Sequence, residues 1–282
     1  MAITFTAETH KYESTEDETK QIDWVSVTSL VGLFKKPFDQ KGIAEKASKN
    51  RNSKWYGMTP EEIIKVWKGE TNRAINLGSW YHDQRETELL MCDTLERSGL
   101  KLPIINPLEM DGVKIAPEQT LVAGVYPEHL VYLKSAGVCG QADRVEVLQD
   151  IIDLYDYKTN KAIKMEAFTS WDGVTQKMLG PLSHLDDCNF NHYALQLSVY
   201  MYVMLKHNHN LKPGKIQIHH IVFEKAGEDE FGYPITALDP VGDPVVKEVV
   251  PYDLPYMKKE VQAMLNYIKI HPEIINIKKK DD

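Results

Sequence analysis

The sequence predicts one mixed α/β domain, and three observations support this fold class. Capped helix-forming segments dominate residues 26–98, and three consecutive strand-like segments follow within 120–159. A helix, a strand and a helix then close the chain between residues 189 and 270. The 282 residues contain no internal repeat and no low-complexity linker. We therefore expect a single domain with a sheet at its centre and an α-helical N-terminal portion.

The N-terminal third begins with a short β segment and then becomes helical. Residues 1–24 are acidic and have the pattern of a strand, a turn and a second strand, and residues 26–34 fit a capped helix. A clearer helix begins within residues 58–70. Its start signals are the N-cap Thr59, the N1 residue Pro60 and the acidic Glu61 and Glu62. A longer helix is expected from about Thr71 to Ser98, with Gly99 as its stop.

The rest of the chain supplies the sheet and the helices that cover it. Strands are expected at 120–133, 137–148, 151–159 and 215–225, and helices at 189–207 and 252–270. The two residues 149–150 leave room only for a tight turn, so the second and third strands should form a hairpin.

Composition narrows the class of protein. The formal net charge is −8 and the pI is near 5.7, which weighs against a protein that coats nucleic acid. Residues 35–54 are an exception, because seven basic residues face only two acidic ones there. That segment is either a solvated helix face or a local groove for a polyanion.

The cysteines and the N-terminal sequence indicate a reducing cytoplasm. Cys92, Cys139 and Cys188 lie far apart without a CxxC pair, which disfavours disulfides, structural zinc and an iron–sulfur cluster. No apolar run is long enough to span a membrane, and we expect no membrane partner. The first residues resemble neither a signal peptide nor a transit peptide.

The strand 151–159 ends with an acid and a base on the same face. Asp156 and Lys158 are two residues apart and point the same way, whereas Tyr157 points to the other face. The hairpin register would bring Asp143 next to Asp156. An ion pair on an edge strand is one interpretation. The other is that two carboxylates beside a lysine hold a divalent cation, for which Mg²⁺ or Mn²⁺ is suited.

Two helical patterns add further candidates. His82 and Glu86 share one face of the long helix, and Gly78 one turn earlier indicates a close approach to another element. In the helix 189–207, Gln196 and Tyr200 also share a face. Gln196 lies among apolar neighbours, where its amide needs partners. Taken alone, each pattern is more often structural than functional.

These motifs, taken in order, resemble the RecB-like branch of the PD-(D/E)XK nuclease superfamily. Within it, the segments around residues 57–82 and 156–163 are similar to the mitochondrial genome maintenance exonuclease and its phage relatives. The similarity covers roughly residues 55–225. The four motifs are Gly78-x-x-x-His82-x-x-x-Glu86, Gly140-x-x-Asp143, Asp156-x-Lys158-Thr159 and Gln196-x-x-x-Tyr200.

The resemblance implies a restriction-endonuclease-like core with Mg²⁺ or Mn²⁺ as cofactor and no iron–sulfur cluster. His82, Asp143, Asp156 and the backbone carbonyl of Tyr157 would hold the metal. Lys158 would orient or deprotonate the attacking water. Residues 71–270 would form the nuclease core, residues 1–70 a helical extension that arches over the substrate, and residues 276–282 a frayed tail.

The resemblance also implies supporting roles. Gln196 and Tyr200 would flank the scissile strand, Glu86 would support the metal or His82, and Glu128 would lie near the site. Apart from the resemblance, Lys161 and Lys164 beyond the strand could grip phosphates, with solvent exposure as the alternative. Lys54 and Trp55 could contact a single-stranded substrate.

The expected function is a metal-dependent DNA exonuclease that acts on single strands or on DNA ends. It would work in a bacterial cytoplasm or in that of a phage-infected host. The alternatives are a flap or junction endonuclease and a catalytically silent nucleic-acid-binding module of the same fold.

Overall fold

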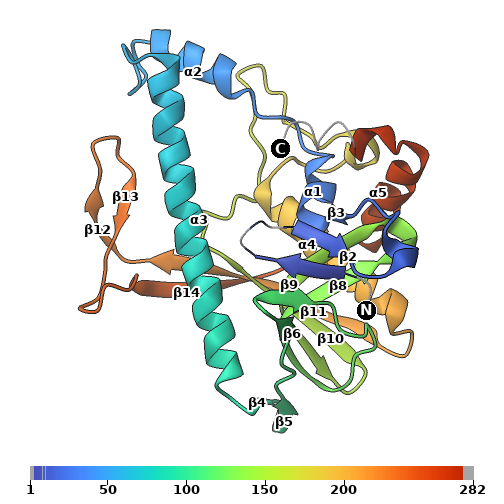
Figure 1. Cartoon of the computed structure of the whole chain (residues 1–282). Helices are drawn as coiled ribbons and strands as arrows, with labels where there is room; N and C mark the ends of the chain where they lie inside the picture. Colours follow the sequence, from blue (N-terminus) through green and yellow to red (C-terminus); the bar gives the residue numbers. More distant parts are fainter. Residues whose placement is uncertain (1–2, 8, 10, 276–282) are drawn as a thin grey trace.

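The computed structural model describes residues 3–7, 9 and 11–275, and its centre is a six-stranded mixed sheet (Figure 1). Its strands are β3 (Val25–Ser26), β8 (Gly124–Leu133), β9 (Val138–Leu148), β10 (Ile151–Lys158), β11 (Lys212–Phe223) and β14 (Val246–Asp253). The order is β14–β11–β10–β9–β3, and β8 pairs with β9. The β10–β11 and β3–β9 pairs are parallel and the others antiparallel. The mixed α/β class is confirmed.

The described part of the chain has five α-helices, which accompany the sheet. They are α1 (Val27–Gly32), α2 (Gln40–Lys49), α3 (Pro60–Leu90), α4 (Asn189–His207) and α5 (Lys258–Ile270). Three short 3-10 helices lie at Asp17–Thr19, Lys134–Ala136 and Gly180–Leu182. Thr59 is the N-cap of α3, as the sequence predicted, and it also forms a capping box with Glu62. None of the described helices has the length and apolarity that crossing a membrane requires.

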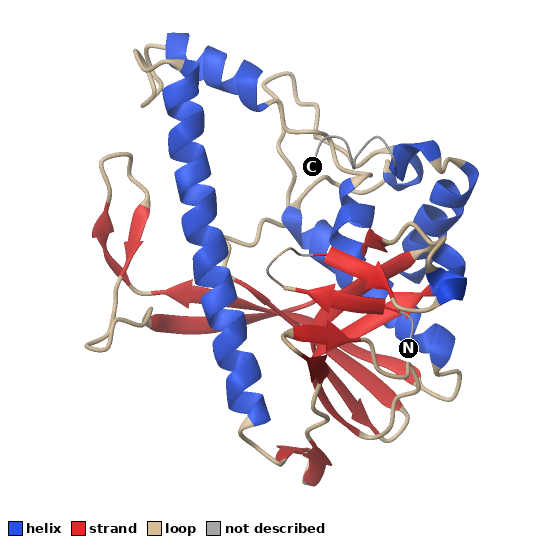
Figure 2. Ribbon diagram, viewed as in Figure 1, coloured by secondary structure: helices blue, strands red, loops and turns tan. Residues whose placement is uncertain are grey.

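The helices lie on opposite faces of the sheet (Figure 2). One face is covered by α4, with α1 and α5 beside it, and this layer forms the main core. The helix α4 is apolar there because residues such as Leu195, Val199 and Met201 are fully buried. On the other face, Tyr81 of α3 packs against Tyr157 of β10. The strand β10 is therefore sandwiched between α3 and α4.

Three smaller sheets extend this core. A four-stranded sheet has the order β2–β1–β7–β6, and two hairpins stand apart. The strands of the four-stranded sheet are β1 (Ile3–Thr6), β2 (Lys11–Ser14), β6 (Leu108–Met110) and β7 (Val113–Ile115). The hairpins are β4 (Thr94–Arg97) with β5 (Leu100–Pro103), and β12 (Lys225–Glu228) with β13 (Pro234–Thr236).

Two predicted helices are shorter than expected. The helix predicted to reach Ser98 is continuous with the one that starts at Pro60, but it ends at Leu90. Ser98 and Gly99 both have positive φ and form the turn of the β4–β5 hairpin. The helix predicted for 252–270 begins at Lys258, because residues before it pair with β11 as strand β14.

The N-terminal region forms the strand–turn–strand and the helix that were predicted for residues 1–24 and 26–34, but not one helical extension over residues 1–70. Residues 1–70 contain β1, β2 and β3, and α1 is buried in the main core through Val27 and Leu30. The part that stands away from the core is α2 with the beginning of α3 (Figure 1). The predicted tail at 276–282 lies outside the described residues.

Candidate metal centre

The site lies where β10 separates from β9. Along one edge, β9 pairs with β3 at residues 138–139 and with β10 at residues 144–148. The segment 140–143 between them is the Gly140-x-x-Asp143 motif. The ladder with β10 stops at Tyr155, and the Tyr157 N–H donates instead to Asp143 Oδ2 at 2.8 Å. The carboxylate thus takes the place of a ladder hydrogen bond.

Three carboxylates form a row across adjacent strands. The β8–β9 ladder keeps one register on either side of Glu128, which places Glu128 opposite Asp143. The β9–β10 ladder ends at the pair Arg144–Tyr155, and the next position of that register places Asp143 opposite Asp156. The predicted proximity of Asp143 and Asp156 is confirmed, and Glu128 extends the row. All three side chains are largely buried.

Glu128 takes up a strained backbone conformation to join this row. Its φ is +47°, in the left-handed region that costs a non-glycine residue roughly 1–2 kcal/mol. The preceding Pro127 cannot donate a ladder hydrogen bond. Gln141, which lies on β9, donates a hydrogen bond to Glu128 Oε2 and so holds the carboxylate in place.

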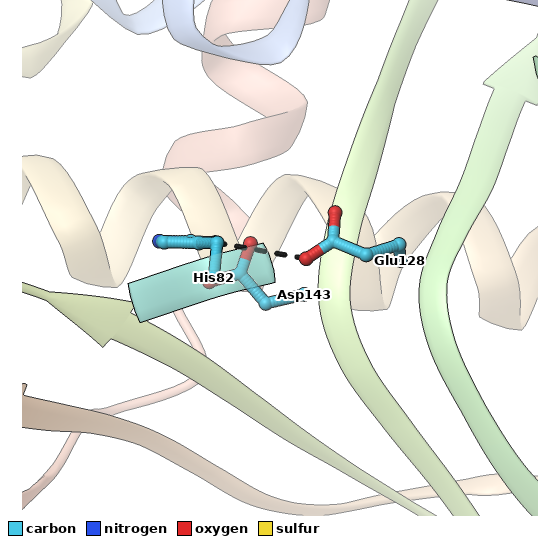
Figure 3. Close-up of side chains that lie close together, drawn as sticks. All are labelled: His82, Glu128 and Asp143. Carbon is cyan, nitrogen blue, oxygen red and sulfur yellow. Dashed lines mark ion pairs between the residues drawn. The ribbon is translucent and has the colours of Figure 1, made fainter. Parts of the chain in front are cut away.

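His82 of α3 completes the group (Figure 3). Its Nδ1 lies 3.4 Å from Asp143 Oδ2 and 3.6 Å from Glu128 Oε1. Its Nε2 lies 3.2 Å from the Tyr157 carbonyl oxygen, which can only accept a hydrogen bond. The carbonyl therefore fixes the ring with Nδ1 directed at the acids.

The charges of the group depend on one another. Burial opposes protonation of His82, but Asp143 and Glu128 outweigh it and raise the pKa of His82 to about 9. Burial also raises the pKa of Asp143, while His82 acts against this rise. The protonated imidazole, together with the Lys158 ammonium for Asp143, compensates these two acids.

Asp156 and Lys158 form a buried ion pair at the end of the row. Lys158 Nζ lies 2.5 Å from Asp156 Oδ2, and Asp156 is only 3% exposed. Burial and the Asp143 carboxylate raise the pKa of Asp156 to about 6, against the effect of Lys158. Burial would lower the pKa of Lys158, but Asp156 and Asp143 outweigh it and raise the pKa. The ammonium is thus charged, and it also lies 5.1 Å from the Tyr193 ring centroid.

Two glycines allow the helices to approach this point. A Cβ at Gly140 would lie 2.7 Å from Tyr200 Cε1, so the ring of Tyr200 rests on the β9 backbone. A Cβ at Gly78 would lie 3.2 Å from Thr159 Oγ1, which confirms the expected close approach of the long helix to another element. Burial raises the pKa of Tyr200 well above its ordinary value, although a hydrogen bond with Gln196 acts in the other direction.

The structure changes the ligand set that the sequence predicted. Among the described residues, the side chains that could share one ion are His82, Glu128 and Asp143, with one donor atom each within 4.8 Å of the others. Glu128, which was expected to lie near the site, thus joins His82 and Asp143 in this candidate group, whereas Asp156 pairs with Lys158 and the Tyr157 carbonyl with His82.

Glu86 has a different partner from the predicted one. Its Oε1 accepts a hydrogen bond from Lys114 Nζ of β7 at 2.7 Å. This ion pair ties α3 to the four-stranded sheet, so the role of Glu86 as a support for His82 is replaced by a structural one.

The predicted substrate contacts are divided between buried and exposed positions. Trp55 is only 7% exposed and stacks on Phe231 with ring centroids 5.6 Å apart, which gives it a packing role in place of base stacking. Lys54 Nζ donates to the Phe231 carbonyl at 2.5 Å. Lys161 pairs with Glu70 at 2.7 Å, and Lys164 is exposed.

Sequence reasoning missed two neighbours of the site. Gln141 lies within the Gly140-x-x-Asp143 motif and shares the face of Asp143, a period-2 signal that was available. Tyr12 of β2 was not detectable, because only the tertiary fold brings the N-terminal hairpin here. Burial, Cys139 and Glu128 raise the pKa of Tyr12.

The donor set could hold a divalent cation. Two carboxylates and one imidazole converge from three separate elements, with one donor atom each close to the others. Asp156 Oδ2 is completely buried and, apart from the ion pair with Lys158, has no polar partner among the described residues. No protein-family model, curated protein or solved structure matches this chain.

Proposed function

We propose that this chain is a divalent-metal-dependent DNA nuclease of the RecB-like PD-(D/E)XK type, which acts as an exonuclease on single strands or DNA ends. The observation that carries the proposal is the row of Glu128, Asp143 and Asp156, met by His82 at one end and Lys158 at the other. A mixed sheet between α3 and α4 supports a restriction-endonuclease-like core.

The residues of the chain divide the chemical work. His82, Glu128 and Asp143 would hold Mg²⁺ or Mn²⁺. When bound, such an ion lowers the pKa of a coordinated water and neutralises phosphate oxygens. Holding it requires His82 to give up the proton that its raised pKa retains.

Lys158 acts as a fixed positive charge. Its ammonium is buried and paired with Asp156, so it is already oriented before substrate arrives. In that state it stabilises the negative charge that develops on the phosphate during attack by water. This favours an electrostatic role over that of a general base, which would need a neutral amine.

Tyr193, Gln196 and Tyr200 form the wall of the site on α4. The Tyr193 hydroxyl donates to Asn160 Oδ1 at 2.5 Å, just beyond the end of β10. This bond holds the segment that follows Lys158 against α4. A scissile strand would lie along this wall.

The basic segment 35–54 supplies an electrostatic path to the site. It includes α2, which stands away from the core at the end of α3 (Figure 1). In a chain of net charge −8, this is where a phosphate backbone would be attracted. The helical arch proposed for residues 1–70 is thus confined to α2 and the start of α3.

One assay distinguishes the proposed function from its alternatives. End-labelled linear and circular DNA, single- and double-stranded, are incubated with Mg²⁺, with Mn²⁺ and with chelator. An exonuclease shortens linear DNA from its ends and leaves circles intact, whereas an endonuclease also opens circles. A silent binding module retains DNA without cleaving it under any of these conditions, and that result would refute the nuclease assignment.

A further inference from the structure

An exposed apolar loop follows the candidate metal centre in sequence. Between β10 and α4, the side chain of Trp171 is 99% exposed and that of Phe168 is 72% exposed. Met165 and Val174 on either side are 56% and 63% exposed. Single exposed apolar residues are common, but four large ones within ten residues of one loop indicate a binding surface.

The loop is ordered by its own hydrogen bonds. Gly173 N donates to the Ser170 carbonyl at 2.9 Å, which closes a tight turn with Trp171 at its tip. Ser170 N and Ser170 Oγ both donate to the Val174 carbonyl at 3.0 Å. Gln176 N donates to the Phe168 carbonyl at 2.8 Å. The backbone therefore presents the indole to solvent in a defined position, which lowers the entropic cost of binding.

The chain that follows this loop is joined to the start of the basic N-terminal segment. Leu179 N donates to the Phe34 carbonyl at 2.7 Å, and Lys36 N donates to Asp187 Oδ2 at 3.1 Å. These bonds hold the region after the loop against the chain that leads into α2. Phe38, at the start of the basic segment, is itself 68% exposed.

We propose that Trp171 and Phe168 form a stacking platform for the bases of single-stranded nucleic acid that leads to the metal centre. The inference rests on the proposed nuclease function and names the form of substrate that the site receives. Stacking on aromatic rings requires unpaired bases and tolerates any sequence. The platform therefore selects single strands over duplex.

Charge favours a nucleic acid over an apolar partner. The loop itself contains Glu166 and Asp172 and is not basic, and Lys177 is paired with Asp186 at 2.5 Å. The positive charge comes from the adjoining segment 35–54. The aromatic rings of the loop and the positive charges of segment 35–54 are separate. This arrangement matches a single nucleic-acid strand, whose bases and phosphates lie on different sides.

The test measures binding without turnover. A fluorescein-labelled oligothymidylate is titrated with the full-length protein in chelator, and its anisotropy is recorded. Trp171→Ala should weaken binding about 10-fold, as expected for the loss of one stacked base. Trp171→Phe should retain most of the affinity. Val241→Ala is the matched control, because Val241 is an exposed apolar residue (83%) on another loop, and its affinity should equal that of the wild type.

An abasic oligomer separates stacking from phosphate contacts. Removing the bases should weaken binding to the wild-type protein more than it weakens binding to Trp171→Ala, which retains only the Phe168 ring of the platform. Equal affinity of the wild type and Trp171→Ala for the oligothymidylate would overturn the proposal, as would equal losses on the abasic oligomer. The proposal would also be overturned if Trp171→Ala abolished binding only to vesicles of anionic phospholipid, because the loop would then be a membrane contact.

A small substrate keeps this inference distinct from the nuclease assignment. A short abasic oligomer has no aromatic ring to stack, so Trp171→Ala should cleave it with Mn²⁺ as fast as the wild type. If neither protein hydrolyses any diester but Trp171 still governs oligonucleotide affinity, the nuclease function fails and the platform stands.

Discussion

The backbone carbonyl of Tyr157 orients the imidazole of His82, with 3.2 Å between the carbonyl oxygen and Nε2. This contact links the strand that carries Asp156 and Lys158 to the helix that carries His82. The distance between α3 and β10 therefore sets where Nδ1 lies. Gly78 permits this approach, because a side chain there would meet Thr159.

Glu128 and Asp143 are expected to determine metal affinity. Glu128→Gln and Asp143→Asn keep the shape of the side chain and remove a charge, so each should weaken Mn²⁺ binding by at least about 10-fold. Isothermal titration calorimetry measures this directly. Mn²⁺ should also raise the melting temperature of the wild type more than that of either variant, since binding to the folded state stabilises it. Unchanged affinity in both variants would exclude this group as the ion site.

His82→Ala should reduce cleavage and be partly rescued by excess Mn²⁺, because two carboxylates remain to bind the ion. The dependence of the cleavage rate on Mn²⁺ concentration gives the measurement. Glu86→Gln is the control on the same helix face, since Glu86 pairs with Lys114 and should leave the Mn²⁺ dependence unchanged. If His82→Ala and Glu86→Gln behave alike, His82 has only a structural role.

Lys158→Ala is expected to abolish cleavage and also to destabilise the fold. The substitution leaves Asp156 buried without its cation, and breaking a buried pair costs roughly 3–5 kcal/mol. Urea denaturation measures the loss of stability, and cleavage is assayed where the variant is folded. The double variant Asp156→Asn with Lys158→Met should recover much of the stability and none of the activity. Recovery of activity would show that the pair serves folding alone.

The sequence predicts the elements with strong local signals. The helix 189–207 and the three strands of the middle region match the structure closely, because apolar periodicity and a two-residue turn define them. The strand 246–253 was missed because it lies at the edge of the sheet and is largely exposed, so it lacks an alternating pattern. The helix was predicted to continue to Ser98, whereas it ends at Leu90 and the β4–β5 hairpin follows it. The positive φ of Ser98 belongs to the turn of this hairpin, which no local sequence pattern indicates.

The sequence predicted the part of the site in which strand register determines the direction of the side chains. A shared face placed Asp156 with Lys158, and the hairpin placed Asp143 beside them. Glu128 reaches its position through a left-handed backbone conformation, which the alternation of side chains along a strand does not predict. Pro127, however, indicates an irregular strand. The partner of Glu86 lies in the separate four-stranded sheet, and no local pattern identifies such contacts.

Gly140→Ala should destabilise the protein through Tyr200. The new methyl group would lie 2.7 Å from Tyr200 Cε1, and overpacking of this kind typically costs about 1–3 kcal/mol. Tyr200→Leu removes the conflicting atom, so the double variant should be more stable than the sum of the two single effects predicts. Chemical denaturation of the four proteins gives this coupling energy. Strict additivity would mean that β9 and α4 move apart to admit the methyl group.

Asp187 should stabilise the fold in a pH-dependent way. It accepts hydrogen bonds from the Lys36 N–H, Gln176 and His192, and it joins the start of the basic segment to α4. Burial alone would raise the pKa of Asp187, but these hydrogen bonds outweigh it and hold the pKa below its ordinary value. A carboxyl whose folded-state pKa is lowered contributes stability above its unfolded pKa and loses it as the pH falls through the folded value.

The comparison is made in a His192→Gln background, so that the imidazole does not titrate. There, Asp187→Ala should lower the free energy of unfolding by about 2 kcal/mol at neutral pH. The difference between the two proteins should shrink as the pH falls below about 4, near the unfolded pKa of aspartate. Urea denaturation across this pH range measures it. A difference that stays constant down to the lowest pH would show that Asp187 acts through packing and not through its charge.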